Sequence, residues 1–421
     1  MSSKQSVNRA DFDVPARVPS NPFFATPAQR VGLARQRFFE EGVRPTGLVS
    51  DTVIQSWTRC LQSHRRPVDA VAFEPVTKSR ISATLARNRE LLAAAQADLG
   101  QLETTLAGTA CKAILTDAHG VVVHATHSER DDGALMWLAG RVGVDLAEDC
   151  VGTNAPGVVA KSGQSCVVQG AEHYFDLTRV MYCAAAPIRD IRGELVGVLD
   201  VSCEARPFRF DAASVVRMYA TAIENRLLSA QSREHVLLRF QATASLLNTP
   251  FEGLAAVDGS GRVAWINAAG ASLLAAPREQ LRGVTAEQAF GLDLAQMQAV
   301  AHHGGVAMRC VPNGLMLCLQ AQLQAHDGQA RLASLALPTS RVAEPAAAYA
   351  MSVAPAWALA TEAEPPAPAA EASLHEANRH LIDRTLAACQ GNVSRAAREL
   401  GVSRGLIYRR LRQGSTATEL N

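Results

Sequence analysis

The side chains whose types indicate chemistry most directly lie between residues 374 and 413. Eight arginines stand there against Glu376, Asp383 and Glu399, a local balance of +5 in a chain whose formal net charge is +1. A guanidinium group presents five N–H donors in a fixed fork that matches phosphate oxygens and the edge of guanine. This basic end, on a mildly acidic remainder, is therefore expected to bind a polyanion.

The spacing within this end predicts three short helices arranged as a helix-turn-helix. Residues 374–389 and 394–400 have helical periodicity, and Gly391 between them suits a left-handed cap. Residues 401–403 form a tight turn whose serine can cap a third helix over residues 404–413. In that geometry the third helix lies in the major groove of double-stranded DNA.

We expect the start of the third helix to read bases and the other basic side chains to contact phosphates. Arg404 is placed to recognise guanine through two hydrogen bonds, and Leu406 to contact a thymine methyl group. The predicted DNA-binding residues are Asn392, Ser394, Arg395, Ser403, Arg404, Leu406, Tyr408, Arg409, Arg410 and Arg412. So short a module has little core of its own, which favours a homodimer on a palindromic operator with half-sites about 10 bp apart. The alternative is a solvated helical hairpin with a basic face, but turn, caps and charge all coincide with DNA binding.

The elements upstream predict a multidomain α+β protein. A length of 421 residues corresponds to about three domains of roughly 150 residues, and short apolar blocks alternate with helical stretches and turn signals. The expected segments are an N-terminal helical region (1–84), a sheet-containing domain (85–210), a connecting or dimerisation helix (211–247), a second small α+β domain (248–337), an Ala/Pro-rich linker (338–373) and the all-α helix-turn-helix (374–413).

The first sheet-containing domain is expected to be antiparallel, since turn signals separate its apolar blocks. The predicted strands are residues 111–117, 121–126, 165–170, 183–188 and 194–202, with one helix near residues 155–161. Upstream, helices are predicted over residues 30–41 and 50–62 from their apolar periodicity.

Residues 211–247 contain neither Gly nor Pro and have helical periodicity, which is typical of a connecting or dimerising helix. A capping helix of the preceding domain is the alternative. In the second domain, a hairpin is predicted over residues 251–258 and 262–267, followed by a helix at 268–275 and weaker strands at 315–323 and 331–337. The linker has 14 Ala and 6 Pro in 36 positions, a composition that cannot form a core.

Polar residues amid the apolar strands of the first domain indicate a binding pocket. Thr153 and Asn154 open a predicted helix, Glu172 and His173 end a strand block, and Cys183 lies on the next strand. These side chains could line a pocket for a small metabolite. The alternative, equally open at this point, is that Asn154 only caps the helix and that Glu172 and His173 form a structural hydrogen-bonded pair.

No metal, cofactor or catalytic residue is expected. His119, His124 and His127 cluster on one hairpin, but alternating strand faces separate the last two, and no cysteine pair has the spacing of a structural zinc site. Trp57 and Trp137 are interpreted as core residues. An enzymatic alternative is a thiol reductase acting through Cys183 or Cys150, which would require a lowered thiol pKa.

Cysteine usage and the N-terminal sequence indicate a cytoplasmic protein. The chain begins without an apolar run behind basic residues, as a secretion signal would have. Nine scattered cysteines without a CxxC pair favour reduced thiols. No stretch is long and apolar enough to predict a membrane span.

The sequence GNVSRAARELGVSRGLIYRRL (391–411) resembles the Fis-type helix-turn-helix that ends bacterial enhancer-binding regulators. Upstream, IQSWTRCL, RNRELLAAA, AILTDAHG, CVGTNAPGVV, GAEHYF and CAAAPIRDIRGELVGVLDVS follow in order and resemble the sensor half of the acetoin-catabolism regulator family. The resemblance implies a GAF-like sensor domain that controls transcription in response to a small molecule or a signalling protein. Residues 251–340 are similar to a PAS domain.

The chain departs from that family at its centre. Members usually carry an AAA+ ATPase between sensor and helix-turn-helix, with which they remodel sigma-54 RNA polymerase. Its phosphate-binding loop, GxxxxGK[ST], cannot occur here, because none of the four lysines follows a glycine. We therefore expect a regulator that represses by occlusion or contacts RNA polymerase directly, or an accessory protein that pairs with an ATPase-bearing relative.

Overall fold

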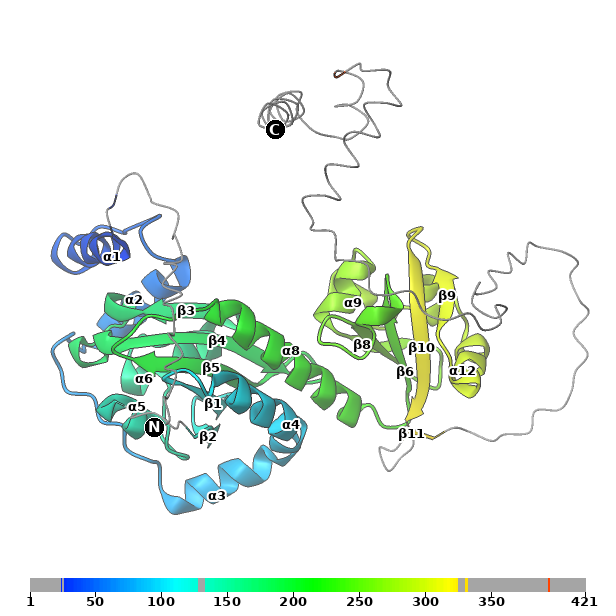
Figure 1. Ribbon diagram of the computed structural model, residues 1–421, viewed down its shortest axis with the longest axis horizontal. Coiled ribbons are helices and arrows are strands. Elements are labelled where there is room, and N and C mark those ends of the chain that lie inside the picture. The colour runs from blue at the N-terminus through cyan, green and yellow to red at the C-terminus, as the bar shows by residue number, and fades with distance from the viewer. Residues whose placement is uncertain (1–23, 25, 128–132, 325–329, 332–392, 394–421) are drawn as a thin grey trace, which may run out of the picture. The chain divides into compact units, whose positions relative to one another are not determined.

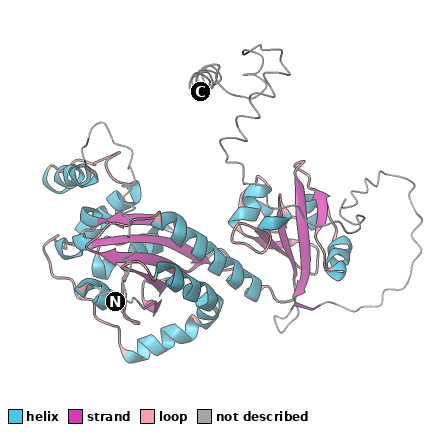
Figure 2. Ribbon diagram, viewed as in Figure 1, coloured by secondary structure: helices cyan, strands magenta, loops and turns pink. Residues whose placement is uncertain are grey.

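The computed structural model describes residues 24, 26–127, 133–324, 330–331 and 393. The chain divides into two compact units, residues 1–337 and 338–421. The described part of the first unit contains two antiparallel sheets with helices packed on them (Figure 1, Figure 2), so the predicted α+β class is confirmed. The predicted linker lies outside the described residues, as does the predicted helix-turn-helix apart from Val393.

The first sheet has the strand order β2-β1-β5-β4-β3, and every neighbouring pair is antiparallel. Its strands are β1 (Cys111–Asp117), β2 (Val122–Ala125), β3 (Cys166–Gln169), β4 (Met181–Arg189) and β5 (Leu195–Glu204). Two aspartates close its hairpins: Asp117 Oδ1 accepts from the N–H groups of His119 and Val121, and Asp190 Oδ1 from those of Arg192 and Glu194. The five predicted strands and both turns are confirmed, because short acidic side chains fix these turns locally.

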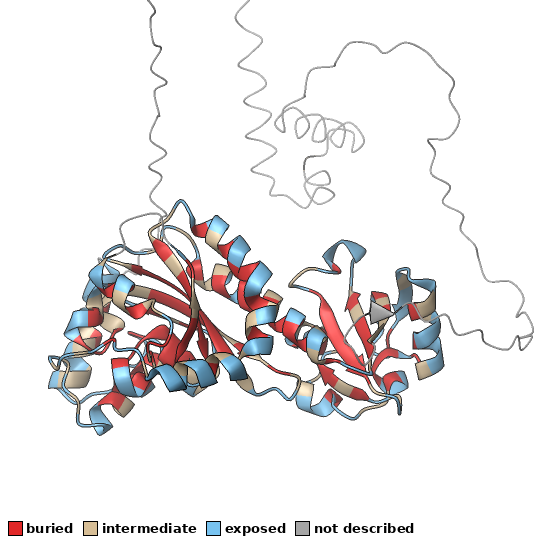
Figure 3. Ribbon diagram, turned by 90° about the horizontal axis from the view of Figure 1, so that it is seen from below, coloured by how far each residue is buried: buried red, intermediate tan, exposed pale blue. Residues whose placement is uncertain are grey.

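Helices cover both faces of the first sheet. Alternate residues such as Ala184 and Ala186 pack with α4 and α8 on one face, whereas Cys183 and Ala185 belong to a second buried cluster on the other. Figure 3 shows that buried residues concentrate on the strands and on the inner sides of these helices. The elements are α1 (Pro27–Arg35), a π-helical turn (Gln36–Glu40), α2 (Asp51–Gln62), α3 (Lys78–Arg87), α4 (Arg89–Leu106), α5 (Ala134–Ala139), α6 (Glu148–Val151), α7 (Ala155–Ser162), the 3-10 turns Gly170–Glu172 and Asp176–Val180, and α8 (Ala212–Gln231).

The predicted boundary between an N-terminal helical region and the sheet domain at residues 84/85 is wrong. Helix α3 runs across it, and side chains of α1 and α2, among them Val31, Ile54 and Trp57, share one core with the strands. The predicted helices at 30–41 and 50–62 exist, and their apolar stripes are buried by packing on the 3-10 turn Gly170–Glu172 and on α6 and α7.

The predicted helix over residues 211–247 is also wrong in its second half. Helix α8 ends at Gln231, Glu234 takes a left-handed conformation with φ of 60°, and β6 (Val236–Gln241) begins the second sheet. Since α8 packs on the first sheet, the alternative of a capping helix describes its first half correctly. Leu237 fits both a helical and a strand pattern, which is why periodicity alone misassigned it.

The second sheet has the order β11-β10-β6-β7-β8, with β9 paired to β10. Its elements are β6, a 3-10 turn (Ala244–Leu246), β7 (Gly253–Val257), β8 (Val263–Ile266), α9 (Ala268–Leu273), α10 (Arg278–Leu281), α11 (Ala286–Phe290), α12 (Leu294–His303), β9 (Ala307–Cys310), β10 (Met316–Gln324) and β11 (Ala330–Arg331). The predicted hairpin and the helix after it are confirmed, and residues 332–337 lie outside the described part. Among the described helices, none has the length and apolar character that crossing a membrane requires.

Candidate ligand-binding pocket

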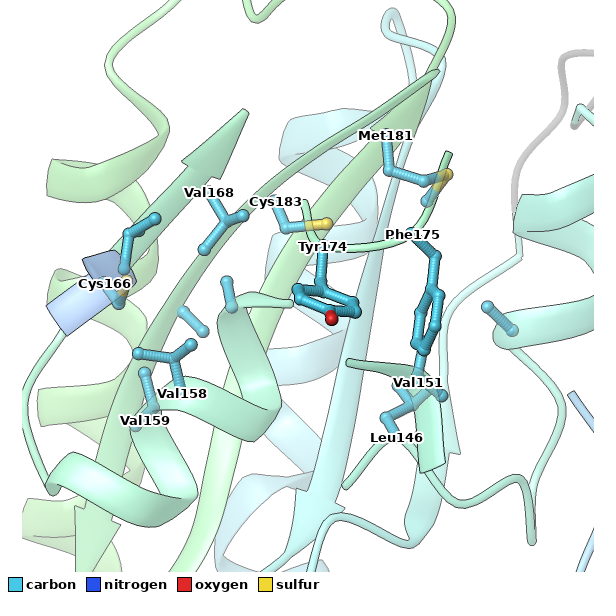
Figure 4. Close-up of a cluster of buried hydrophobic side chains, with 14 of the residues drawn as sticks. Leu146, Val151, Val158, Val159, Cys166, Val168, Tyr174, Phe175, Met181 and Cys183 are labelled. Carbon is cyan, nitrogen blue, oxygen red and sulfur yellow. The ribbon is translucent and has the colours of Figure 1, made fainter. Parts of the chain in front are cut away.

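A small cavity lies in the core between the first sheet and helices α5, α6 and α7. Its volume is about 30 Å³, two to three times the roughly 10–15 Å³ that one water needs. Figure 4 shows the buried apolar side chains of this region, including Cys183 and Met181 of β4. The cavity is lined by Phe73, Ile114, Leu135, Ala139, Leu146, Val151, Asn154, Pro156, His173, Thr178, Met181, Cys183, Asp200 and Ser202.

Asn154 lies on the cavity wall, and it caps α7. Its Oδ1 accepts from the N–H of Gly157 at 2.9 Å, and its Nδ2 donates to the carbonyls of Leu146 and Gly152 at 3.0 and 2.8 Å. This capping is the role that the structural alternative predicted, and it is compatible with a place on the wall. Thr153 does not line the cavity: its hydroxyl lies 2.7 Å from that of Ser56 on α2.

His173 lines the cavity with a neutral imidazole, and both of its ring nitrogens have hydrogen-bond partners. Burial lowers its pKa to about 4. Its Nδ1 donates to the carbonyl of Gly170 at 3.0 Å, so Nε2, 3.4 Å from Cys183 Sγ, is the acceptor for the thiol. The structure thus brings two predicted site residues, His173 and Cys183, into contact on one wall.

Glu172 does not belong to this wall, and the predicted hydrogen-bonded pair of Glu172 with His173 is not present. Its Oε2 accepts from the N–H of Gln169 at 2.9 Å, and its backbone carbonyl accepts from Trp57 Nε1 at 2.8 Å. Glu172 therefore ties the segment before His173 to helix α2.

Asp200 and Ser202 of β5 were missed in the sequence. Asp200 is 1% exposed, its Oδ2 accepts from Ser202 Oγ at 2.6 Å, and its Oδ1 has no hydrogen-bond partner. Burial raises the pKa of this carboxyl to about 8, so it is mostly protonated at pH 7. A buried polar atom left unsatisfied costs about 1–3 kcal/mol. The signal was available as a lone acid inside the apolar strand GVLDVS.

The N-terminal helices hold the segment that closes this pocket. Arg35 of α1 donates to the carbonyls of Ala171, His173 and Tyr174 at 3.0, 2.8 and 3.2 Å. Its guanidinium also lies 4.6 Å from the ring centroid of Phe39. Burial lowers the pKa of Arg35 to about 10, which leaves it charged at pH 7. These helices therefore contribute to the site by positioning His173.

The thiol-reductase alternative is disfavoured by the surroundings of both cysteines. Burial raises the pKa of Cys183 well above its usual value, and burial together with Asp145 and Asp149 raises that of Cys150. Neither thiol is thus activated as a nucleophile. In the described part of the chain, no three His, Cys, Asp or Glu side chains gather as metal ligands would. Trp57 is a core residue as predicted, whereas Trp137, 57% exposed, is not.

A second, open cleft of about 710 Å³ lies between α4, α8 and the loops of the second sheet. Its charged side chains are paired with one another: Arg226 lies 2.7 Å from Asp98, and Arg239 contacts Glu252. The enclosed cavity is therefore the better candidate for a ligand. All ten predicted DNA-binding residues, Asn392, Ser394, Arg395, Ser403, Arg404, Leu406, Tyr408, Arg409, Arg410 and Arg412, lie outside the described residues.

Two known protein families match the chain. Residues 25–223 match the family described as MimR, N-terminal domain, which covers the first sheet and its helices. Residues 373–414 match the family described as bacterial regulatory protein, Fis family. The second match falls on the segment in which the sequence predicts a helix-turn-helix.

Individual relatives are similar to this chain over half of its length. The acetoin catabolism regulatory protein of Cupriavidus necator is 31% identical over 225 residues, 51% of this chain and 33% of the relative. The propane 2-monooxygenase operon transcriptional activator MimR of Mycolicibacterium smegmatis is 28% identical over 218 residues, 51% and 35% of the two chains. The matched region thus spans about a third of either relative.

A chain in the crystal structure of the E. coli DhaR(N)–DhaL complex is 16% identical to this one, with a TM-score of 0.41. The similarity covers 65% of this chain and 99% of that one.

Proposed function

Because the chain carries a MimR-type N-terminal domain and a Fis-family helix-turn-helix, we propose that it is a transcriptional regulator that binds a palindromic operator as a homodimer. In this proposal the first sheet with its helices is a GAF-like sensor for a small metabolite or a protein partner, and the second sheet is a PAS-like domain. The single observation that carries the proposal is the presence of both families on one chain.

The enclosed cavity supports the assignment of a sensor. It is walled by apolar side chains with a few convergent polar groups, as small-molecule sites are. In this proposal helix α8 transmits a change in the sensor to the second sheet. It packs on β4 and β5, and its Asn225 accepts a hydrogen bond from Asn267 Nδ2 at 3.0 Å. Glu224 of the same helix lies 3.3 Å from Arg278 on α10.

The mechanism proposed needs no ATP hydrolysis by this chain. The segment between the two sheets and the tail is the Ala/Pro-rich linker, and no lysine stands in a GxxxxGK[ST] pattern. The regulator would then act by occluding a promoter or by contacting RNA polymerase directly.

Substitutions of two arginines in the predicted helix-turn-helix distinguish sequence specificity from overall affinity for DNA. Arg404→Ala should cost roughly 1–3 kcal/mol of binding to the specific site and relax one base position, because Arg404 is assigned to a base. Arg412→Ala should weaken specific and random DNA alike and reduce the salt slope by about one unit, because Arg412 is assigned to a phosphate.

The measurement is fluorescence anisotropy of the full chain on sites selected in vitro from random DNA, at several salt concentrations. If both substitutions lower the affinity for specific and random DNA equally, the third helix is not the reader.

A second candidate is an accessory regulator that pairs with a longer relative bearing an ATPase domain. It is favoured by the sharing of the N-terminal domain with relatives that are about three times as long as the matched region. Co-purification with such a relative, together with weak operator binding by this chain alone, would support this candidate over the first.

A further inference from the structure

Two cysteines lie directly opposite each other at one end of the first sheet. Cys111 is the first residue of β1, Cys203 is the last but one of β5, and the register of these antiparallel strands pairs them. Both are free thiols, 6% and 3% exposed, in the buried cluster between the sheet and helices α4 and α8. Within the strands that the structure describes, no other two cysteines are register partners. The fold thus brings together two thiols that are far apart in the chain.

Cys111 and Cys203 form a non-hydrogen-bonded pair of the β1–β5 ladder. The N–H of Ala113 donates to Thr126 Oγ1 at 3.0 Å, and its carbonyl accepts from the N–H of Thr126 at 2.9 Å, so these backbone groups face β2. Because the direction alternates along a strand, the backbone groups of Cys111, two residues earlier, also face away from β5. In such a pair the Cα atoms lie about 4.5 Å apart and the side chains approach closely. This separation is within the roughly 4.4–6.8 Å that a disulfide spans.

The two thiols of this pair differ in reactivity. A hydrogen bond from the Cys203 thiol lowers the pKa of Cys111 to about 7. The same contact, together with burial, raises the pKa of Cys203. The thiolate is the nucleophilic form of cysteine, so Cys111 is the attacking sulfur and Cys203 keeps its proton. Burial raises the pKa of Cys183 and of Cys150 instead, which sets the pair apart from these thiols.

We propose that Cys111 and Cys203 are a dithiol site at which hydrogen peroxide, small enough to reach a nearly buried sulfur, closes a disulfide between β1 and β5. The Cys111 thiolate attacks one peroxide oxygen, the O–O bond breaks, and the other oxygen takes up a proton and leaves as water, which makes Cys111 a sulfenic acid. The Cys203 sulfur then attacks the sulfur of Cys111, so that the S–S bond forms, the S–O bond breaks and a second water leaves with the Cys203 proton. Two electrons pass from the two thiols to one peroxide. This site goes beyond the proposed function and does not rest on it.

Closure of the disulfide changes the connection between β5 and α8. The Cys203 thiol lies 3.0 Å from the carbonyl of Arg206, to which it donates in the segment that leads into α8. A disulfide sulfur carries no proton, so oxidation removes this donor. Ala205 in the same segment already has a left-handed backbone with φ of 64°. Oxidation therefore leaves the two strands in register but loosens residues 205–211.

Peptide mapping of the full-length wild-type chain tests the site. The reduced protein is treated with hydrogen peroxide, its remaining thiols are blocked with iodoacetamide in denaturant, and it is digested with trypsin without reduction. Mass spectrometry should find the peptide of Cys111 joined to that of Cys203, and dithiothreitol should separate them. The exposed Cys150 and Cys310 serve as internal controls for the oxidant. If Cys111 and Cys203 are still alkylated when these two are oxidised, or if Cys111 joins other cysteines equally often, the proposal is overturned.

A pair of variants assigns the two roles. Cys203→Ser keeps a side chain of similar size that can donate to Arg206 but removes the second sulfur, so the sulfenic acid of Cys111 should persist. Dimedone should then label Cys111 about tenfold more than in the wild type. The matched control Cys150→Ser, at an exposed thiol, should form the disulfide as the wild type does. Equal labelling of Cys111 in the two variants would contradict the role of Cys203, and far-UV circular dichroism of both checks the fold.

Hydrogen exchange of the reduced and the oxidised wild type tests the consequence at α8. The amides of residues 205–211 should exchange about threefold faster or more after oxidation, because the Arg206 carbonyl has lost its donor. Those of β7, in the other sheet, should be unchanged and serve as the reference. Equal exchange of residues 205–211 in the two forms would overturn the link between this site and α8.

Discussion

The two sheets of the N-terminal unit bury polar side chains to the same depth but use them differently. On the first sheet, Asp200 is 1% exposed and leaves one oxygen without a partner beside a cavity. On the second, Asn267 is also 1% exposed, yet its Oδ1 accepts from the N–H groups of Leu254 and Gly270, and its Nδ2 donates to Asn225 and to the carbonyl of Glu252.

The difference lies in the side chains next to each buried polar group. Phe240 and Phe290 pack at 5.1 Å between ring centroids inside the second sheet domain. The core on the cavity side of the first sheet also holds aromatic rings, Tyr174 and Phe175 among them, but Asp200 shares the cavity wall with the smaller side chains Cys183 and Ser202. The contrast therefore lies in the immediate neighbours of the two buried polar side chains, since small neighbours leave a void that larger ones would fill. The first sheet thus keeps a cavity beside a polar atom without a partner, whereas Asn267 of the second sheet is hydrogen-bonded to Asn225 of α8.

The largest expected effect is on the pH dependence of stability, through Asp200 of the first sheet. Its folded pKa of about 8 lies above the ordinary value of 3.8, so the unfolded chain releases the proton first and wild-type stability should fall as pH rises from about 4 to about 8. The slope should reach about 1.4 kcal/mol per pH unit at most. The non-titrating Asp200→Asn variant should therefore gain stability relative to wild type over this window, as measured by denaturant unfolding at several pH values.

The matched substitution on the second sheet, Asp258→Asn, should change stability in the opposite direction. Hydrogen bonds from Ser260 and Arg262 lower the pKa of Asp258 in the β7–β8 turn. Its contribution is present above the ordinary pKa and lost as pH falls, so Asp258→Asn should be less stable than wild type at pH 7 and equal to it in acid. For the first substitution, parallel profiles of unfolding free energy against pH for wild type and Asp200→Asn would show that Asp200 is not held protonated.

A smaller effect is expected at the ion pair inside the second sheet domain. Glu252 is 2% exposed, contacts Arg239 and accepts from the N–H of Asn248 at 2.6 Å. Glu252→Gln leaves the guanidinium without its counter-charge, which should cost about 2–3 kcal/mol because Arg239 retains some access to water. The exposed Glu287→Gln should change the free energy of unfolding by less than about 0.5 kcal/mol. Equal stabilities of the two variants would mean that this pair is dispensable.

The smallest effect tests how tightly the second core is closed. A Cβ on Gly270 would lie 2.8 Å from Phe240 Cζ and 2.9 Å from Ile266 Cγ1. Gly270→Ala should therefore destabilise by about 1–3 kcal/mol through overpacking. Gly100→Ala on α4, where a Cβ meets no atom within 4 Å, should instead stabilise by about 0.5–1 kcal/mol. A neutral Gly270→Ala would indicate spare room in the second core and weaken the contrast.

Local signals predicted much of this fold from sequence. Asp117 and Asp190 close their turns through their own side chains, and Ser50 and Asn154 cap the helices that follow them, so each feature is decided within a few residues. Domain boundaries failed for the opposite reason. Helices α1 and α2 pack against α6, α7 and the 3-10 turn Gly170–Glu172, which are contacts between segments far apart in the chain.

The site was predictable only in part because side-chain direction depends on both faces of the sheet. Asn154, His173 and Cys183 reach the cavity, but Thr153 turns toward α2 and Glu172 toward Gln169. Asp200 alternates with the apolar Leu199 and Val201, a pattern that predicts a solvent-facing acid on a sheet with one covered face. Helices α5 and α7 pack on that face, so it is covered as well, and periodicity along β5 cannot show this.

The central claim is sequence-specific regulation of transcription, and genome-wide footprinting of the tagged protein tests it most directly. The full-length chain and a truncation lacking residues 374–421 should be compared in the same cells. The account predicts discrete palindromic sites for the full chain, all of them lost on truncation. Sites that persist without the tail, or the absence of discrete sites for the full chain, would contradict it.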